Sequence, residues 1–552
     1  MSLPDPHQWP VEEPFADRTD DVDSSEEAVS PNDIRRPDDP GAVGDLLRER
    51  TRSTPDATAV IDADAGEQWT YGEFDDRVSR RVERLEGRFG VEAGRAGLLL
   101  DTSVAFADVY FATERRAGAV VPLNLDLPTE TLRTQAERAE IDCLFCESDT
   151  EELATEVAPA DVPVASVDAP GRDEVTSLEP RTDAATWPFE QSLDADRVVL
   201  FTSGTTGDPK GVRLTRWNLV ASAVGSAYRL GVDPDDRWLA PLPMYHMGGL
   251  APLVRSTLYG TTTVIQRSFD AESTARVMAD YDVTGVSLVP TMLVRLLDAD
   301  WTPPESLRFV LLGGAPASGQ LLDRALDRGI PVYPTYGATE TASQVATATP
   351  DEVREYSGTV GRPLRGTDVS IRDVTDCAVG TTDSAAETTG PGERGEVVVS
   401  GPTVTPGYLD EGQTATAFDE DGGFHTGDVG YRDDAGRLWV VGRLDDRIVT
   451  GGENVHPADV TEALVGLPDV ADAAVVGLPD EEWGERVAAL VVPADQDDPP
   501  TADEMRAGLR GRVADYALPK SVACTDELPR TASGTVDRDA VRSELSGGVD
   551  RE

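Results

Sequence analysis

The chain has 552 residues, of which 102 are acidic and 49 basic, so its formal net charge is -53. This charge argues against nucleic acid as a partner, because the phosphate backbone would be repelled. Apolar residues make up 39% of the chain, which is too large a share for an acidic disordered protein.

Lysine occurs only at positions 210 and 520, and arginine supplies every other basic residue. A folded chain with this charge balance repels itself in ordinary buffer. Molar salt shortens the Debye length to about 3 Å and screens the repulsion. The composition is therefore typical of a protein from a salt-filled cytoplasm, as in halophiles, and we expect its stability to fall in dilute salt.

The N-terminal segment differs from the rest of the chain. Residues 1–40 are acidic with little hydrophobic pattern, and we predict a disordered tail there. The N-terminus lacks the basic and apolar regions of a signal peptide, and no apolar run reaches the roughly 18 residues that a membrane span needs. We therefore expect a cytoplasmic protein without membrane insertion.

From residue 41 onward, segments with the pattern of strands alternate with helical segments. We predict a strand over 96–100, a helix over 104–117 and a strand over 118–123, and the theme recurs at 264–265, 285–289 and 309–312. This alternation favours a layered α/β body with a largely parallel sheet. Residues 375–392 are predicted to form a surface loop before a strand at 395–400. Shorter, mixed segments after residue 458 predict a small α+β domain.

The four cysteines do not suggest a disulfide framework or a zinc site. Cys143 and Cys146 form a C-x-x-C, but no second pair follows, and their run is apolar like a buried strand. Cys377 and Cys524 are isolated. We interpret the C-x-x-C pair as core residues.

The most informative motif spans residues 201–211, with three glycines, four hydroxyl side chains and one lysine. Glycines allow the positive φ that turns backbone N–H groups toward an anion, and Lys210 adds a positive charge. The spacing differs from a Walker loop, because no Ser or Thr follows the lysine. The motif predicts a phosphate-binding loop that contains Thr202, Ser203, Gly204, Thr205, Thr206, Gly207 and Lys210.

This loop resembles the signature of the acyl-adenylate-forming, AMP-binding superfamily, which includes acyl-CoA synthetases, peptide-synthetase adenylation domains and luciferases. Further motifs follow in the family's order at 241–246, 312–316, 336–340, 426–428, 442–446, 451–454 and 528–534. The resemblance covers almost everything after the acidic tail. It implies a large AMP-binding domain over 41–441 and a small mobile domain over 442–552, with a hinge at Asp445.

The resemblance also implies roles for individual residues in ATP binding. Gly313, Gly314 and Ala315 would lie against the adenine, Tyr336 and Gly337 would adjoin them, and Tyr336 would stack on the base. Asp428 would accept the ribose hydroxyls, and Thr339 would bond to the α-phosphate. Glu340 would hold Mg²⁺. The implied catalytic set is Lys210, His246, Thr339, Glu340 and Arg443.

One position departs from the family pattern. Most of the superfamily has a lysine directly after the glycine of the last motif, and Thr535 stands there instead. Three interpretations remain open: Arg538 substitutes for the lysine, Lys210 and Mg²⁺ suffice, or adenylation is impaired. We favour retained activity, since the other motifs are intact.

Within the superfamily, the segment 311–345 most resembles the 2-succinylbenzoate–CoA ligases of menaquinone biosynthesis. This resemblance implies ATP, Mg²⁺ and CoA as reactants or cofactors. The second carboxylate of such an acid needs polar donors, and the candidates are Ser287, Thr291, Ser343 and Gln344. The resemblance places His246 at the mouth of the same acyl pocket, next to the reacting carboxylate. The alternatives are a ligase for another aromatic or medium-chain acid, and a non-catalytic ATP-binding paralogue. The oligomeric state stays open, with a homodimer among the options.

Overall fold

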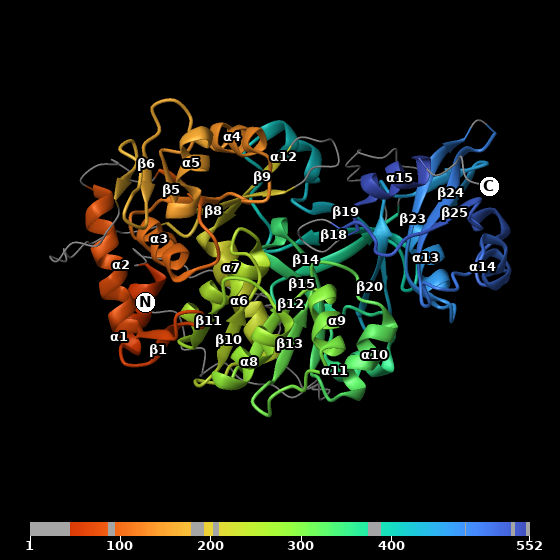
Figure 1. Ribbon diagram of the computed structural model, residues 1–552, viewed down its shortest axis with the longest axis horizontal. Coiled ribbons are helices and arrows are strands. Elements are labelled where there is room, and N and C mark those ends of the chain that lie inside the picture. The colour runs from red at the N-terminus through yellow and green to blue at the C-terminus, as the bar shows by residue number, and fades with distance from the viewer. Residues whose placement is uncertain are drawn as a thin grey trace, which may run out of the picture.

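The structure is a computed structural model that describes residues 45–86, 94–177, 192–202, 209–373, 388–480, 482–530 and 536–547. The predicted tail over 1–40 and most of the predicted loop over 375–392 lie outside these residues. Figure 1 shows a large body that contains most of the chain, from the red N-terminal elements to the teal strands, and a smaller C-terminal body, drawn in blue, beside it. None of the helices in the described ranges is both long and apolar enough to cross a membrane.

The predicted layered α/β body is confirmed, and its first sheet has seven strands. The predicted strand, helix and strand appear as β3 (Arg95–Leu99), α3 (Val104–Arg115) and β4 (Ala119–Pro122), and β3 and β4 pair in parallel. The two predicted core cysteines are buried in β5. Among the strands described in this sheet, only the edge strand β9 (Lys210–Thr215) runs antiparallel to its neighbour. In spatial order the strands are β7 (Thr176–Ser177), β6 (Val164–Ser166), β5 (Cys143–Cys146), β3 (Arg95–Leu99), β4 (Ala119–Pro122), β8 (Asp196–Thr202) and β9 (Lys210–Thr215).

A second sheet has nine strands, and its six central strands are parallel. The carboxyl ends of parallel strands meet at one edge of a sheet. The motifs at 241–246, 313–315 and 336–340 all lie at or just beyond such ends, so the fold gathers them along one edge. In spatial order the strands are β16 (Arg362–Pro363), β15 (Ser343–Thr347), β14 (Val332–Ala338), β13 (Phe309–Leu312), β12 (Gly285–Leu288), β10 (Arg237–Ala240), β11 (Thr262–Ile265), β1 (Thr58–Asp62) and β2 (Glu67–Thr70).

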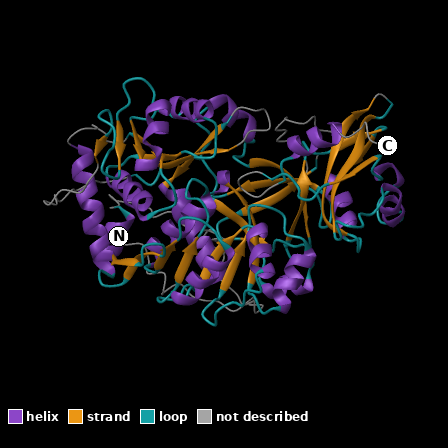
Figure 2. Ribbon diagram, viewed as in Figure 1, coloured by secondary structure: helices purple, strands orange, loops and turns teal. Residues whose placement is uncertain are grey.

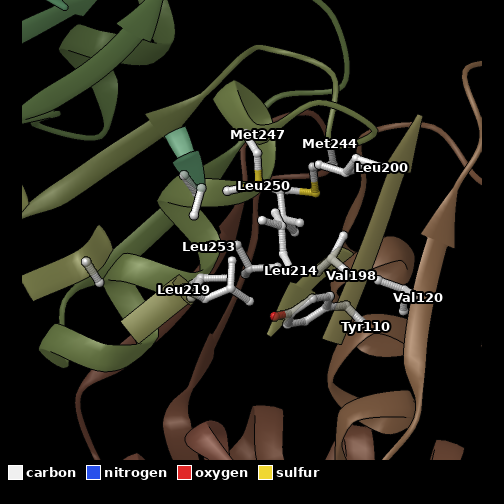
Figure 3. Close-up of a cluster of buried hydrophobic side chains, with 14 of the residues drawn as sticks. Tyr110, Val120, Val198, Leu200, Leu214, Leu219, Met244, Met247, Leu250 and Leu253 are labelled. Atoms are coloured by element: carbon white, nitrogen blue, oxygen red, sulfur yellow. The ribbon is translucent and has the colours of Figure 1, made fainter. Parts of the chain in front are cut away.

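Helices α6 (Arg216–Leu230) and α7 (Met247–Tyr259) lie between the two sheets and carry the main hydrophobic core. Figure 3 shows Leu219 and Leu250 from these helices beside Val198 and Leu214 of the first sheet and Tyr110 of α3. These side chains are nearly inaccessible to water. The other helices are α1 (Leu46–Ser53), α2 (Tyr71–Glu86), α4 (Thr129–Arg138), α5 (Glu151–Val157), α8 (Ala271–Asp280), α9 (Pro290–Asp298), α10 (Gly319–Asp327), α11 (Pro350–Glu355) and α12 (Glu411–Ala417).

A four-stranded antiparallel sheet joins the large body to the small one. Its strands are β17 (Asp368–Arg372), β18 (Gly395–Ser400), β19 (Phe424–Arg432) and β20 (Leu438–Arg443). The chain then enters the small body, at the blue end of Figure 1, where strands and helices are mixed as predicted (Figure 2). Its elements are β21 (Ile448–Thr450), β22 (Glu453–Val455), α13 (Pro457–Val465), β23 (Val470–Asp480), β24 (Gly484–Pro493), α14 (Ala502–Leu509), β25 (Ser521–Cys524) and α15 (Arg538–Gly547).

The small body has hydrophobic cores of its own. One cluster includes Val475 and Val487 with residues of α13 and α14, and another includes Val476 and Ala488 with residues of α15. Because side chains alternate across a strand, these clusters lie on opposite faces of the β23–β24 pair. The change from β20 to β21 falls between residues 443 and 448, next to the predicted hinge at Asp445.

Candidate active site

The glycine-rich loop connects β8 to β9, which form an antiparallel hairpin. Thr202 and Lys210 face each other as the last pair of this ladder, so they flank the entrance and exit of the loop. Ser203, Gly204, Thr205, Thr206 and Gly207 lie outside the described residues. The structure therefore places the two ends of the predicted phosphate-binding loop.

Lys210 and Glu340 meet at a residue that the sequence analysis did not select. The Lys210 ammonium lies 5.3 Å from the centroid of the Tyr408 ring. The Tyr408 hydroxyl donates to the Glu340 carboxylate at 3.0 Å, and the Thr405 amide donates to the Glu340 carbonyl at 2.7 Å. Burial and the Glu340 charge raise the pKa of Tyr408, so its hydroxyl stays protonated and can donate. Tyr408 thus joins two predicted catalytic residues that are 130 positions apart.

A second group of residues surrounds Asp428 at the end of the large body. The Tyr336 hydroxyl donates to the Asp428 carboxylate at 2.6 Å, and the Arg443 guanidinium donates to its other oxygen at 3.2 Å. Arg443 also bonds to the predicted hinge residue Asp445 at 3.1 Å. Burial raises the pKa of Asp428 and the Arg443 charge opposes this shift. The structure therefore brings together Tyr336, Asp428 and Arg443, which the resemblance had assigned to one nucleotide.

The backbone around Glu340 follows a tight path that depends on glycine. Thr339 and Glu340 form a single turn of 3₁₀-helix after β14, and the chain returns as β15. A Cβ added at Gly337 would lie 1.7 Å from the Ser343 carbonyl oxygen, so no other residue fits there. Ala342 and Ser343 have positive φ angles of 50° and 111°. Strained backbone of this kind is concentrated at functional sites.

Gly313, Gly314 and Ala315 follow β13 directly, beside the parallel strand β14 that carries Tyr336. A Cβ at Gly313 would lie 2.7 Å from the Thr335 side chain, and Gly314 has a φ of +81°. Small residues are therefore required by the local packing, and they leave backbone accessible next to Tyr336.

His246 caps the N-terminus of α7 with its backbone, and its ring stacks edge-on against Tyr245 at 4.8 Å. Burial lowers the pKa of His246, so the imidazole is neutral at pH 7. Its Nε2 atom is buried and has no hydrogen-bond partner among the described residues. A buried polar atom without a partner is unfavourable, and a ligand could satisfy it.

Arg255 is a buried arginine on the helix that His246 caps, and the sequence analysis missed it. It lies on α7, nine residues after His246, and it is 2% exposed. Its guanidinium donates to the Ser222 hydroxyl at 3.3 Å and lies 5.5 Å from the centroid of the Trp238 ring. Within the described ranges it pairs with no carboxylate. Burial lowers the pKa of Arg255 to about 10.

Three predicted acid-pocket residues, Ser287, Ser343 and Gln344, are linked to Arg255 by Trp238 and Ser222, which both contact its guanidinium. The Ser287 hydroxyl accepts from the Trp238 indole at 3.0 Å, and the Ser222 hydroxyl donates to the carbonyl of Ala342, which precedes Ser343 and Gln344. Gln344 is buried, donates to Thr347 at 2.8 Å, and has no partner in the described structure for its side-chain oxygen. The fourth candidate, Thr291, is partly buried in the first turn of α9.

Two cations of the small body bear on the missing lysine of the last motif. Arg538 forms an ion pair with Asp446, next to the predicted hinge, so it is already occupied. Lys520 is exposed, and its ammonium lies 3.3 Å from the centroid of the Trp483 ring. Thr535 falls outside the described residues.

Comparison with known proteins agrees with this arrangement. The family profile for AMP-binding enzymes matches residues 47–409, and the profile for their C-terminal domain matches residues 459–535. The chain is similar to 2-succinylbenzoate–CoA ligase of Bacillus cereus, with 36% identity over 499 residues, which are 90% of this chain and 97% of the relative.

Solved structures give the same result. The o-succinylbenzoate CoA synthetase from Bacillus subtilis, in complex with the acyl-adenylate intermediate OSB-AMP, superposes with a TM-score of 0.81 at 32% identity, covering 91% of this chain and 98% of that one. The same enzyme in complex with ATP and magnesium ion superposes with a TM-score of 0.80 at 32% identity, covering 91% and 99%. The chain therefore belongs to the AMP-binding enzyme family, with the large AMP-binding domain and the smaller C-terminal domain of that family.

Proposed function

We propose that the chain is an AMP-forming acid–CoA ligase that converts 2-succinylbenzoate, ATP and CoA to 2-succinylbenzoyl-CoA, AMP and pyrophosphate, a step of menaquinone biosynthesis. One carboxylate oxygen of the acid attacks the α-phosphorus of ATP, and the bond to pyrophosphate breaks. The CoA thiol then attacks the acyl carbon of the adenylate, loses its proton and releases AMP. The similarity to ligases of that name over nearly their whole length supports the proposal. Since MgATP and CoA are cytoplasmic metabolites, we assign the reaction to the cytoplasm.

The choice of acid rests on the buried guanidinium of Arg255. 2-Succinylbenzoate has two carboxylates and only one is activated, so the other must be stabilised inside the protein. Arg255 is a buried cation without a carboxylate partner in the described structure, and an anionic group of the substrate would offset the cost of burying its charge. Ser287 and Gln344 offer further polar atoms in the same neighbourhood. A monocarboxylic acid would leave Arg255 unpaired.

The phosphates of ATP are assigned to the residues around Tyr408, namely Lys210, Thr339 and Glu340. Lys210 supplies a positive charge, and Thr339 donates to the α-phosphate. Glu340 is a single carboxylate, and among the described residues no cluster of three or more His, Cys, Asp or Glu side chains could hold a metal ion. This fits Mg²⁺, which one or two carboxylates commonly hold together with substrate phosphates. Glu340 would hold Mg²⁺, which neutralises charge as pyrophosphate leaves.

The nucleoside is assigned to the residues around Asp428. Tyr336 would stack on the adenine beside Gly313, Gly314 and Ala315, where small residues leave room for a flat base. Asp428 would accept the ribose hydroxyls. His246, whose Nε2 has no partner among the described residues, would lie next to the reacting carboxylate. Because its imidazole is neutral, it would not attract the second carboxylate of the acid to that position.

The small body would bring CoA to the adenylate. Trp483 is an exposed large aromatic side chain, at 40%, and the Lys520 ammonium lies on its ring. The Gly451 amide donates to the Trp483 carbonyl at 2.9 Å, so this surface adjoins the glycine motif at 451–454. An aromatic surface with one ammonium, on an otherwise strongly acidic chain, suits the adenine and phosphates of CoA. Movement about Asp445 would present it to the large body.

The first experiment is pyrophosphate release in molar KCl with MgATP, comparing 2-succinylbenzoate, benzoate and a medium-chain fatty acid, with and without CoA. We expect release with 2-succinylbenzoate alone and thioester formation when CoA is added. Release with only another acid would keep the class of ligase and reject the substrate. Measurable ATP binding without release from any acid would favour the non-catalytic paralogue.

A further inference from the structure

Strand β19, which carries Asp428, leaves its ladder with β18 over residues 426–428, while Asp428 remains opposite Arg443 in the ladder with β20. Glu396 pairs with Val429 and Val398 pairs with His425, so a step of two residues on β18 faces a step of four on β19. Two extra residues are thereby accommodated within the segment 426–428. Gly427, at its centre, has a φ of +71°. A β-bulge bends its strand and redirects a side chain, here the carboxylate of Asp428.

The backbone donors of this bulge are satisfied by side chains instead of by the neighbouring strand. The Gly427 amide donates to one oxygen of Glu396 at 3.1 Å, and the Asp428 amide donates to the Thr426 hydroxyl at 3.0 Å. The Thr426 hydroxyl in turn donates to the Val397 carbonyl at 2.7 Å. Buried backbone N–H groups need such partners, so the bulge depends on these side chains.

Glu396 is itself held by His425. The second oxygen of Glu396 lies 2.8 Å from His425 Nδ1, and His425 Nε2 lies 3.8 Å from an oxygen of Asp419. The exposed fractions of the three side chains are 12%, 10% and 3%, so the group is shielded from solvent. Since a carboxylate is acceptor-only, His425 Nδ1 is the donor to Glu396.

The bulge also touches the chain that leads to the small body. The Gly427 carbonyl accepts from the Leu444 amide at 2.8 Å, one residue before the predicted hinge. A Cβ at Gly427 would lie 3.0 Å from the Arg443 guanidinium, so Arg443 packs directly on the bulge. The position of the bulge therefore fixes both Asp428 and its partner Arg443.

We propose that Glu396 and His425 are positioning residues for ribose recognition: they hold the bulge that directs Asp428 toward the ribose of ATP. This inference rests on the proposed role of Asp428. Glu396 fixes the main chain through the Gly427 amide, and His425 fixes the orientation of the Glu396 carboxylate. Neither residue touches the nucleotide in this scheme.

The test compares kcat/KM for ATP with kcat/KM for 2′-deoxy-ATP and 3′-deoxy-ATP, measured by pyrophosphate release. In the unmodified enzyme, loss of a hydroxyl that donates to a carboxylate should lower kcat/KM by about 10- to 100-fold. We call kcat/KM for ATP divided by kcat/KM for a deoxynucleotide the deoxynucleotide ratio. Glu396→Ala should raise KM for ATP and bring the deoxynucleotide ratio to within about threefold of one, with a smaller change in kcat. Glu396→Gln keeps an acceptor for the Gly427 amide and should recover most of the ratio.

His425 is tested with a matched pair of variants. His425→Phe keeps the ring and removes the donor, and it should reduce the ratio as Glu396→Ala does. His425→Asn retains a donor near the position of Nδ1 and should restore it. As a control, Glu352 has the same side-chain exposure of 12% and also accepts a backbone amide, that of Thr349, at 3.0 Å. Glu352→Ala should leave the ratio unchanged even if it lowers stability.

The outcomes separate this inference from the proposed function. If Asp428→Ala leaves the deoxynucleotide ratio intact, the ribose role of Asp428 is wrong and the inference fails with it. If Asp428→Ala brings the deoxynucleotide ratio to about one while folded Glu396→Ala and His425→Phe keep the ratio of the unmodified enzyme, only the inference is overturned. A loss of kcat that is equal for all three nucleotides would mean that Glu396 has a purely structural role.

Discussion

Arg115 and Arg255 are each 2% exposed, but their surroundings differ. Arg115 on α3 binds both oxygens of Asp45 at 3.0 Å, donates to Ser79 at 2.7 Å and pairs with Asp75. Arg255 on α7 has one hydroxyl, one indole ring and no carboxylate in the described structure. Similar burial therefore accompanies full pairing in one region and incomplete pairing in the other.

The pKa values of the two guanidinium groups follow this difference. Burial alone would lower the pKa of Arg115, but Asp45 and Asp75 outweigh it and raise the pKa. Burial lowers the pKa of Arg255 to about 10, and only Tyr259 opposes it. A paired buried charge belongs to the folded framework, whereas an incompletely paired one near an active site indicates a ligand. The following predictions test this distinction.

The largest effect is expected on stability at Arg115. Arg115→Met leaves Asp45 and Asp75 buried without their cation, which should lower the free energy of unfolding by about 3–5 kcal/mol. Arg255→Met leaves no described carboxylate buried without a cation. It should therefore leave the free energy of unfolding unchanged or raise it. Chemical denaturation of both variants in molar KCl measures the contrast. Equal destabilisation by the two substitutions would contradict it.

The next effect is expected on activity at Arg255. Arg255→Met should lower kcat/KM for 2-succinylbenzoate by about 30- to 1,000-fold, the range for losing a charge-assisted pair of about 2–4 kcal/mol. For an analogue of the acid that lacks the second carboxylate, the same substitution should lower kcat/KM much less, because this analogue has no group that pairs with Arg255. Arg115→Met, assayed while still folded, is the control and should not change the ratio of the two acids. A uniform loss for both acids would refute the assignment of Arg255 to the second carboxylate.

A smaller effect is expected at Arg538, whose ion pair with Asp446 places it with the structural charges. Arg538→Ala should keep the rate of pyrophosphate release within about threefold, or roughly 0.7 kcal/mol, of the unmodified enzyme. Lys210→Ala should lose about 100-fold or more, since it removes a charge assigned to the phosphates. This result would mean that Lys210 and Mg²⁺ suffice where Thr535 replaces the family's lysine. A large loss in Arg538→Ala would instead make Arg538 the substitute cation.

The smallest effect is expected at a paired charge in solvent. Arg394 of the large body binds Asp459 of α13 through two hydrogen bonds of 2.9 and 3.2 Å, with both side chains 43% exposed. Exposed pairs contribute about 0.2–1 kcal/mol, so Arg394→Ala should shift the balance between domain orientations by no more than about fivefold. Single-turnover pyrophosphate release should slow slightly while thioester formation does not. Equal slowing of both half-reactions would argue against a role in domain orientation.

The strands that build the site were predictable because each is a short apolar run. The predicted strand over 309–312 is β13, and that over 285–289 is β12 with one residue fewer. Parallel strands buried on both faces have this continuous pattern, and glycine-rich motifs mark their carboxyl ends. The roles of the motif residues came from resemblance to the family, and they stay predictions.

Arg255, Tyr408 and the bulge at Gly427 were not predicted, for physical reasons. An arginine in the latter half of a helix is ordinarily favourable at the surface, where it complements the helix dipole. Its burial here results from the packing of α6 and β10 on α7, which no local pattern encodes. Tyr408 meets Lys210 and Glu340 only after the chain has folded back over large separations. The bulge depends on how side chains of β18 pair with β19, and register is a tertiary property.

The scarcity of lysine has a practical consequence for chemical labelling. Amine-reactive reagents would find only two side chains, Lys210 beside Tyr408 in the candidate active site and Lys520 on the exposed Trp483 surface. Bound nucleotide should shield the first and leave the second open, so among the lysine side chains an ordinary succinimidyl ester would select the one on the small body. A fluorophore attached there would report movement of that body against the large one, without any engineered cysteine.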